Sequence, residues 1–126
     1  PEFDTSVPES FRRLTSNYQR LTVNFRFAEA RTKLDNKAQR DLLRVKHYLR
    51  QHNRDASDLL LIGFADAQSH ELRAQMISEL RALSVRKALG QAGVANVAYT
   101  GYGHYMPVGG KGNLRNGRVE VWIKNP

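Results

Sequence analysis

Two side chains of opposite charge, Asp66 and Arg81, are the residues best suited to binding chemistry. Asp66 follows an apolar run at 59–63 that is typical of a buried strand, and Arg81 is on the helix expected next. Ligands of open α/β sheets tend to bind beyond the carboxyl ends of the strands. A carboxylate accepts hydrogen bonds from an ammonium, and a guanidinium pairs with a carboxylate in bidentate fashion. Together the two residues could therefore hold a zwitterion.

Both residues also have ordinary structural roles open to them. Asp66 can cap a turn or the start of the helix, as Ser69 can instead. Arg81 is next to Leu80 and four residues after Ile77, so we expect it at the margin of the buried helix stripe. There its stem can cover apolar surface while the charge reaches water. On spacing alone, these structural roles are favoured over a ligand site.

Signals of catalysis, metal binding or cofactor binding are poor. His47 and His52 are five residues apart, which does not place them on one helix face as paired metal ligands. The chain has no cysteine, no nucleophile elbow and no complete dinucleotide or phosphate-loop motif. We therefore expect no enzyme, no metal and no cofactor.

Length and charge limit the remaining classes. The chain has 126 residues, enough for one domain with one core, and no apolar run long enough to span a membrane. Its net charge of +8 favours an anionic partner, such as nucleic acid, lipid head groups or a carboxylate-bearing wall polymer. The basic residues are spread along the chain, which favours a solvated basic surface.

Hydrophobic periodicity predicts the elements that position these residues. Residues 21–27 alternate as a strand with one buried face, and 59–63 indicate a central strand buried on both faces. A helix capped by Asp35 lies between them and ends near 52–53. Its apolar stripe is formed by Ala38, Leu42, Val45 and Leu49.

A second helix, a short strand around 97–99 and a last strand at 118–123 complete the pattern. In the second helix we expect a stripe of Ile77, Leu80, Ser84 and Ala88, widened by Val85 and Leu89. In the last strand, Val119, Val121 and Ile123 should point inward. The order βαβαββ predicts an α/β two-layer sandwich, a mixed four-stranded sheet with helices on one face.

The N-terminal region is expected to lie outside this domain. We interpret Pro1-Glu2-Phe3 as a cloning scar, since a common restriction site encodes Glu-Phe. Phe11, Leu14 and Tyr18 have helical spacing, which indicates a short helix docking on the domain, or equally the frayed end of a linker. The expected division is therefore 1–20 and 21–126.

An ordered set of short motifs resembles the OmpA-like peptidoglycan-binding family. Gly63-Phe64-Ala65-Asp66, then Ser78, Arg81-Ala82 and Val85 are similar to the family's Gly-His-Thr-Asp and Asn-x-x-Leu-Ser-x-x-Arg-Ala-x-x-Val, including the fifteen-residue offset from Asp to Arg. Residues 23–27 and 34–35 match its first strand and helix entry. Residues 93–94, 101–103, 107–108 and 116–121 match its closing segment. The resemblance covers about residues 21–124.

This resemblance implies non-covalent binding of the diaminopimelate residue in a peptidoglycan stem peptide. Asp66 would bind the ammonium or shape a loop whose backbone N–H groups bind the carboxylate, and Arg81 would pair with the carboxylate. Four further positions are candidate ligand contacts: Phe64, Ala65, Ile77 and Arg118. The domain would then anchor a periplasmic or outer-membrane-associated protein to the wall of a Gram-negative envelope. Residues 11–21 also resemble OmpA-like tails that follow periplasmic phosphate-binding-type domains, which implies an upstream domain.

The departures from the family pattern keep an alternative open. Phe64-Ala65 replaces His-Thr, Ala74 replaces the helix Asn, Ile77 replaces Leu, and Gly117 replaces the first Arg of Asn-Arg-Arg-Val. The polar groups around the Asp–Arg pair are thereby reduced. The alternative is a degenerate OmpA-like fold that serves as a protein interaction or dimerisation module, with Phe64 in the contact. Nucleic-acid binding, suggested by the charge and five tyrosines, is disfavoured because no aromatic-basic strand motif is present.

Overall fold

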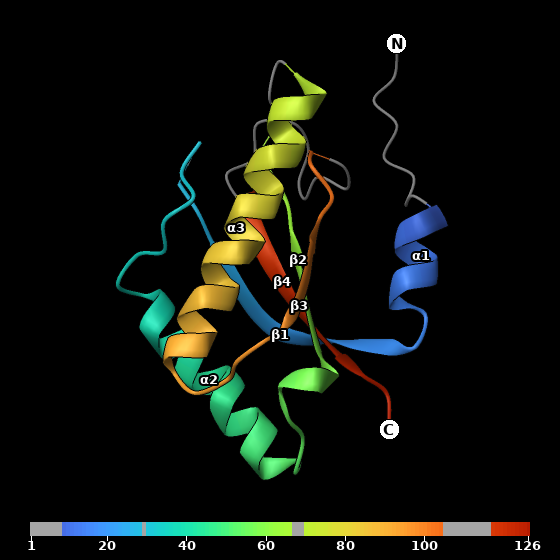
Figure 1. Ribbon diagram of the computed structural model, residues 1–126, viewed down its shortest axis with the longest axis vertical. Coiled ribbons are helices and arrows are strands. Elements are labelled where there is room, and N and C mark those ends of the chain that lie inside the picture. Colours follow the sequence, from blue (N-terminus) through green and yellow to red (C-terminus); the bar gives the residue numbers. More distant parts are fainter. Residues whose placement is uncertain (1–8, 29, 67–69, 105–116) are drawn as a thin grey trace.

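In the residues that the structure describes, the fold is a mixed four-stranded sheet with three α-helices (Figure 1). The computed structural model describes residues 9–28, 30–66, 70–104 and 117–126. The elements run in the order α1 (Glu9–Thr15), β1 (Tyr18–Arg26), α2 (Ala38–Gln51), β2 (Leu59–Gly63), α3 (Glu71–Gln91), β3 (Ala98–Gly101) and β4 (Arg118–Lys124), with a 3-10 turn, Ala56–Asp58, before β2. The strand order is β1-β4-β2-β3. β4 is antiparallel to β1 and β2, whereas β2 and β3 are parallel, which confirms the predicted fold class.

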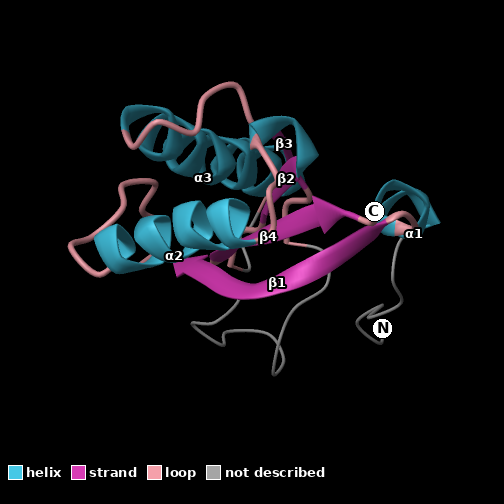
Figure 2. Cartoon of the chain, turned by 90° about the horizontal axis from the view of Figure 1, so that it is seen from below, coloured by secondary structure: helices cyan, strands magenta, loops and turns pink. Residues whose placement is uncertain are grey.

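The main core lies between one face of the sheet and the helices α2 and α3, which Figure 2 shows side by side on that face. Alternation in β1 and β4 sends every second residue into it, as predicted. The predicted stripe of α2 faces the sheet, and Asp35 accepts hydrogen bonds from the backbone N–H groups of Lys37 and Ala38 at the start of the helix. All five residues of β2 are buried, as expected of a central strand.

The opposite face of the sheet carries a second, aromatic cluster, which α1 covers. Phe11 of α1 packs there with Leu60, Ile62 and Phe64. Partly buried Leu14, Tyr18, Tyr102 and Trp122 complete the cluster. Helices α2 and α3 thus share one face as predicted, while α1 lies on the other. Of the residues before the expected boundary at 21, those of α1 and the start of β1 pack into the fold through the aromatic cluster.

The buried face of α3 differs from the predicted stripe. Leu80 is 42% exposed, and Ser84 and Ala88 are half-buried. The face that meets the sheet consists of Ala74, Ile77, Ser78, Arg81, Ala82, Val85 and Leu89. Periodicity failed here because a serine and an arginine lie on the buried side, while Leu72 and Met76 lie outside. Arg81 is therefore at the centre of the stripe and not at its margin.

A glycine lets α3 approach the end of β2 closely. A Cβ added at Gly63 would overlap the carbonyl oxygen of Ser78, so any side chain there would push the helix away. The Ser78 hydroxyl donates to the Gln75 carbonyl and accepts from the Gly103 N–H. This contact places the next turn of α3, with Arg81, beside the residues that leave β2.

Candidate functional site

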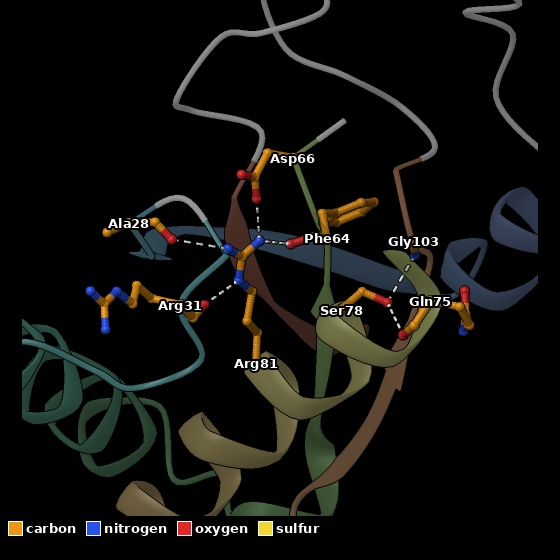
Figure 3. Close-up of polar contacts among 8 residues, drawn as sticks. All are labelled: Ala28, Arg31, Phe64, Asp66, Gln75, Ser78, Arg81 and Gly103. Atoms are coloured by element: carbon orange, nitrogen blue, oxygen red, sulfur yellow. Dashed lines mark hydrogen bonds and ion pairs between the residues drawn. The ribbon is translucent and has the colours of Figure 1, made fainter. Parts of the chain in front are cut away.

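The structure brings Asp66 and Arg81 together beyond the carboxyl end of β2 (Figure 3). Nη1 of Arg81 donates to Oδ1 of Asp66 over 2.8 Å and to the carbonyl oxygen of Phe64 over 3.1 Å. The Arg81 side chain is fully buried, and that of Asp66 is 13% exposed. The pair therefore has a buried positive end and a negative end that reaches the surface.

Arg81 also fastens the connection between β1 and α2. Its Nε donates to the Arg31 carbonyl over 2.8 Å, and Nη2 donates to the Ala28 carbonyl over 3.1 Å (Figure 3). Its Cζ atom lies over the Phe27 ring, 5.4 Å from the ring centre. Four hydrogen bonds thus engage most of the five N–H donors of the guanidinium. These bonds offset the cost of burying the charge.

Asp66 presents one engaged oxygen and one that has no partner within the described part of the chain. Oδ1 accepts from Arg81, while Oδ2 forms no hydrogen bond or ion pair with a described residue. Asp66 does not cap α3, since the N-cap is His70, which makes no side-chain cap bond. Arg81 does not extend along the surface with its charge in water. Helix capping by Asp66 and an Arg81 charge in water therefore do not describe this pair, whereas a turn capped by Asp66 would involve residues 67–69, outside the described residues.

Three of the other predicted contacts lie around the pair in different ways. Phe64 contributes its carbonyl oxygen, while its fully buried ring packs in the aromatic cluster. Ala65 donates its N–H to the Gly103 carbonyl over 2.7 Å and packs with Ala74 and Ile77. Ala65 and Ile77 thus form an apolar support next to the site. Whether any of them contacts a ligand stays a prediction.

Arg118 lies on the opposite face of the sheet. Its guanidinium stacks on the Phe64 ring with 4.1 Å to the ring centre, and Nε donates to Oε2 of Glu120 over 3.0 Å. Burial lowers the pKa of Arg118 from its ordinary value, an effect that Glu120 opposes. The Arg118 side chain thus contacts Phe64 and Glu120, and whether it contacts a ligand stays a prediction.

Gly117 is a residue at the site that sequence reasoning missed as a contributor. A Cβ there would lie 3.1 Å from Nη1 of Arg81 and 3.3 Å from Oδ1 of Asp66. The position is thus in contact distance of both charged groups. Its replacement of an arginine in the family pattern was a usable signal. The carbonyls of Ala28 and Arg31 carry no such signal, because any residue type supplies a carbonyl.

Other kinds of site find no support in the described residues. No group of three or more histidine, aspartate or glutamate side chains in that part of the chain is placed to hold a metal ion. No helix in the segments described is both long and apolar enough to cross a bilayer. The loop residues 67–69 and 105–116, which include Ser69, Pro107 and several glycines, lie outside the described residues.

A model of the OmpA family matches residues 26–116, which is most of the chain and contains the Asp66–Arg81 pair. The chain belongs to the OmpA family. A comparison with curated protein sequences finds no match. Solved structures do match. The OmpA-like domain of FopA1 from Francisella tularensis is 25% identical with a TM-score of 0.72, over 82% of this chain and 71% of that one.

Two further structures show how widely this fold is used. The peptidoglycan-associated lipoprotein of Burkholderia pseudomallei is 18% identical with a TM-score of 0.65, over 81% of this chain and 89% of that one. A periplasmic domain of Helicobacter pylori MotB is 21% identical with a TM-score of 0.65, over 86% and 73%. At these identities the likeness shows the fold alone. The OmpA-family assignment rests on the family model.

Within the OmpA family fold, the substitution at Phe64 has a structural explanation. Its ring is fully buried among Phe11, Tyr102 and Arg118, and only its backbone reaches the charged pair. The alternative function as an interaction module required Phe64 in an intermolecular contact. Because the ring is used inside the chain, that alternative gains no support from it.

Proposed function

We propose that this domain binds peptidoglycan non-covalently through the diaminopimelate residue of the stem peptide. OmpA-like domains are known for peptidoglycan binding. The observation that carries the proposal is the Asp66–Arg81 pair, with its contact of 2.8 Å and its carboxylate toward the surface. The side-chain end of diaminopimelate carries an ammonium and a carboxylate on one carbon. A paired carboxylate and guanidinium match that head group in charge.

Asp66 is the residue that meets the ammonium in this proposal. Oδ2 accepts a hydrogen bond from the ligand while Oδ1 remains on Arg81. Because the guanidinium is buried and fixed by three carbonyls, it holds the carboxylate in one orientation before the ligand arrives. Such preorganisation lowers the entropic cost of binding.

Arg81 has a second role toward the ligand carboxylate. Its bonds to Phe64, Ala28 and Arg31 are all directed inward, so a bidentate pair with a ligand requires one of these carbonyls to give way. If all three carbonyl bonds stay in place, Arg81 attracts the ligand carboxylate only through its positive charge, and it also holds Asp66 in position. In either case the site binds and does not catalyse.

Peptidoglycan binding implies that the domain is in the periplasm and that its partner is the cell wall. The domain anchors a protein of the Gram-negative envelope to the wall from the periplasm, and an upstream domain carries the anchored activity. The description of the MotB neighbour as a periplasmic domain supports this setting.

Co-sedimentation with diaminopimelate-type sacculi tests the proposal. Asp66→Asn keeps an oxygen for Arg81 but removes the charge that binds the ammonium, so affinity should fall by about tenfold or more. Asp41→Asn is the matched control, since Asp41 forms a long, partly exposed contact of 3.7 Å with Arg44 on α2. It should sediment as the unaltered domain does. An unaltered domain that stays in the supernatant, or an Asp66→Asn variant that binds normally, would overturn the proposal.

A further inference from the structure

Helix α1 packs on the fold mainly through Phe11, with the partly buried Leu14 in the same cluster. All seven residues of α1 are described, and Phe11 alone among them is buried. Its ring meets Tyr102 edge-on at 5.2 Å, Trp122 edge-on at 5.8 Å and Phe64 at 6.3 Å between centres. Isolated helices of this length are marginal in water. The docking of α1 therefore depends on Phe11.

Two of these contacts lead directly into the chain segment that carries Asp66. The ring of Phe64 packs against Phe11, while its carbonyl accepts from Arg81 at 3.1 Å. A side chain whose ring is fixed also fixes the direction of its own backbone, because the ring's position limits φ and ψ at that residue.

Tyr102 provides the second connection. Its N–H donates to the Gly63 carbonyl over 2.9 Å, and the neighbouring Gly103 accepts from the Ala65 N–H over 2.7 Å. These bonds lie just before and just after Phe64. Phe11 thus packs against the rings of Phe64 and Tyr102, and the backbones of these two residues form hydrogen bonds at the end of β2.

We propose that Phe11 is a positioning residue for the Asp66–Arg81 site, so that undocking of α1 weakens binding there. This inference rests on the proposed function. When Phe11 leaves, the rings of Phe64 and Tyr102 lose their common neighbour, and the Phe64 carbonyl and Asp66 become less ordered. The site is then bound more weakly, although no residue that touches the ligand has changed.

Sedimentation with sacculi is the first test. Phe11→Ala should weaken binding by about three- to tenfold. Arg13→Ala, which alters a side chain 80% exposed on the same helix, should leave binding unchanged. Phe11→Leu keeps apolar bulk and should restore most of the affinity. Emission of Trp122, the single tryptophan of the chain, reports α1 docking and should change in Phe11→Ala but not in Arg13→Ala.

A double-mutant cycle on unfolding tests the coupling without a ligand. Phe11 and Asp66 share no contact, and such pairs normally act additively. Each single variant, Phe11→Ala or Asp66→Ala, changes the unfolding equilibrium constant by some factor. If the two residues are coupled, the factor measured for the double variant should differ by at least about threefold from the product of the two single factors. If the unaltered domain does not bind sacculi, the proposed function fails and this cycle alone decides the coupling. Additive effects in the cycle, or a Phe11→Ala variant that binds normally, would overturn the inference.

Discussion

Two arginines are buried in the part of the domain that the structure describes, one on each face of the sheet, and their surroundings differ. Arg81 gives three of its four hydrogen bonds to backbone carbonyls, and its carboxylate partner, Asp66, is 13% exposed. Arg118 stacks on an aromatic ring, and its partner, Glu120, is 2% exposed. Glu120 also accepts from the Trp122 indole over 3.0 Å and pairs with Arg20 over 3.2 Å.

Under the proposed function, this difference separates a binding arrangement from a structural one. Both oxygens of Glu120 are occupied by side chains of its own sheet, so no acceptor remains for a ligand. Asp66 has one oxygen engaged and the other directed away from Arg81 (Figure 3). A buried guanidinium is therefore not itself a sign of function in this molecule. The exposure of the paired carboxylate distinguishes the two.

Removal of Arg81 should have the largest effect. Arg81→Ala leaves three carbonyls and a carboxylate without their donor, so the free energy of unfolding should fall by about 5 kcal/mol or more. Loss on that scale approaches the whole stability of a small domain. Urea denaturation followed by circular dichroism measures it.

Arg86 of the same helix provides the control. Its Nε donates to a single carbonyl, that of Val97, over 2.9 Å. Arg86→Ala should lower the free energy of unfolding by about 1 kcal/mol. Equal losses from the two variants would contradict the role assigned to Arg81 in fastening three segments.

Removal of Glu120 should affect stability but not binding. Glu120→Leu leaves the Arg118 guanidinium buried without its carboxylate, which should cost about 3 kcal/mol in the free energy of unfolding. Adding Arg118→Met removes the stranded charge and should recover most of that loss. Denaturation measures both variants, and sacculus sedimentation of the double variant should match that of the unaltered domain. Weaker wall binding by the double variant would show that the second face takes part in the site.

A third ion pair, Arg54 with Asp58, is more exposed than the other two. Its removal should change the stability least. The hydrogen bond from Arg54, over 3.1 Å, and one from the Asp55 N–H lower the pKa of Asp58 from its ordinary 3.8. A lowered carboxyl pKa contributes stability above pH 3.8 that is lost as the pH falls through the folded-state value. Asp58→Asn should therefore flatten the pH dependence of the urea midpoint slightly, and only below about pH 4. A change that extends to neutral pH would point to another group.

Much of the fold follows from periodicity because burial repeats with the backbone. Leu21, Val23 and Phe25 alternate in β1, and Val119 and Val121 alternate in β4, all toward the main core as predicted. The Asp–Arg pairing was also expected, since a residue after a central strand and a residue on the next helix meet at one edge. The bond lengths and the burial of Arg81 were not expected.

What could not be predicted depends on contacts between segments distant in sequence. Arg81 can lie on the buried face of α3 because the carbonyls of Ala28 and Arg31, in the connection between β1 and α2, accept hydrogen bonds from it. The outward residues of β4 were predicted to face away from the core, yet Arg118 and Glu120 are buried. The spacing of Phe11, Leu14 and Tyr18 indicates a short helix, but no local pattern shows that it covers a second cluster on that face.

The most direct test of the central claim is a calorimetric titration with two matched stem peptides that differ only in diaminopimelate or lysine at the third position. Lysine keeps the ammonium but lacks the adjoining carboxylate, so a site for the zwitterion should bind the diaminopimelate peptide at least about tenfold more tightly. Asp66→Asn should abolish that difference. Equal affinity for the two peptides, or no heat with either, would contradict the account of Asp66 and Arg81 as a zwitterion site.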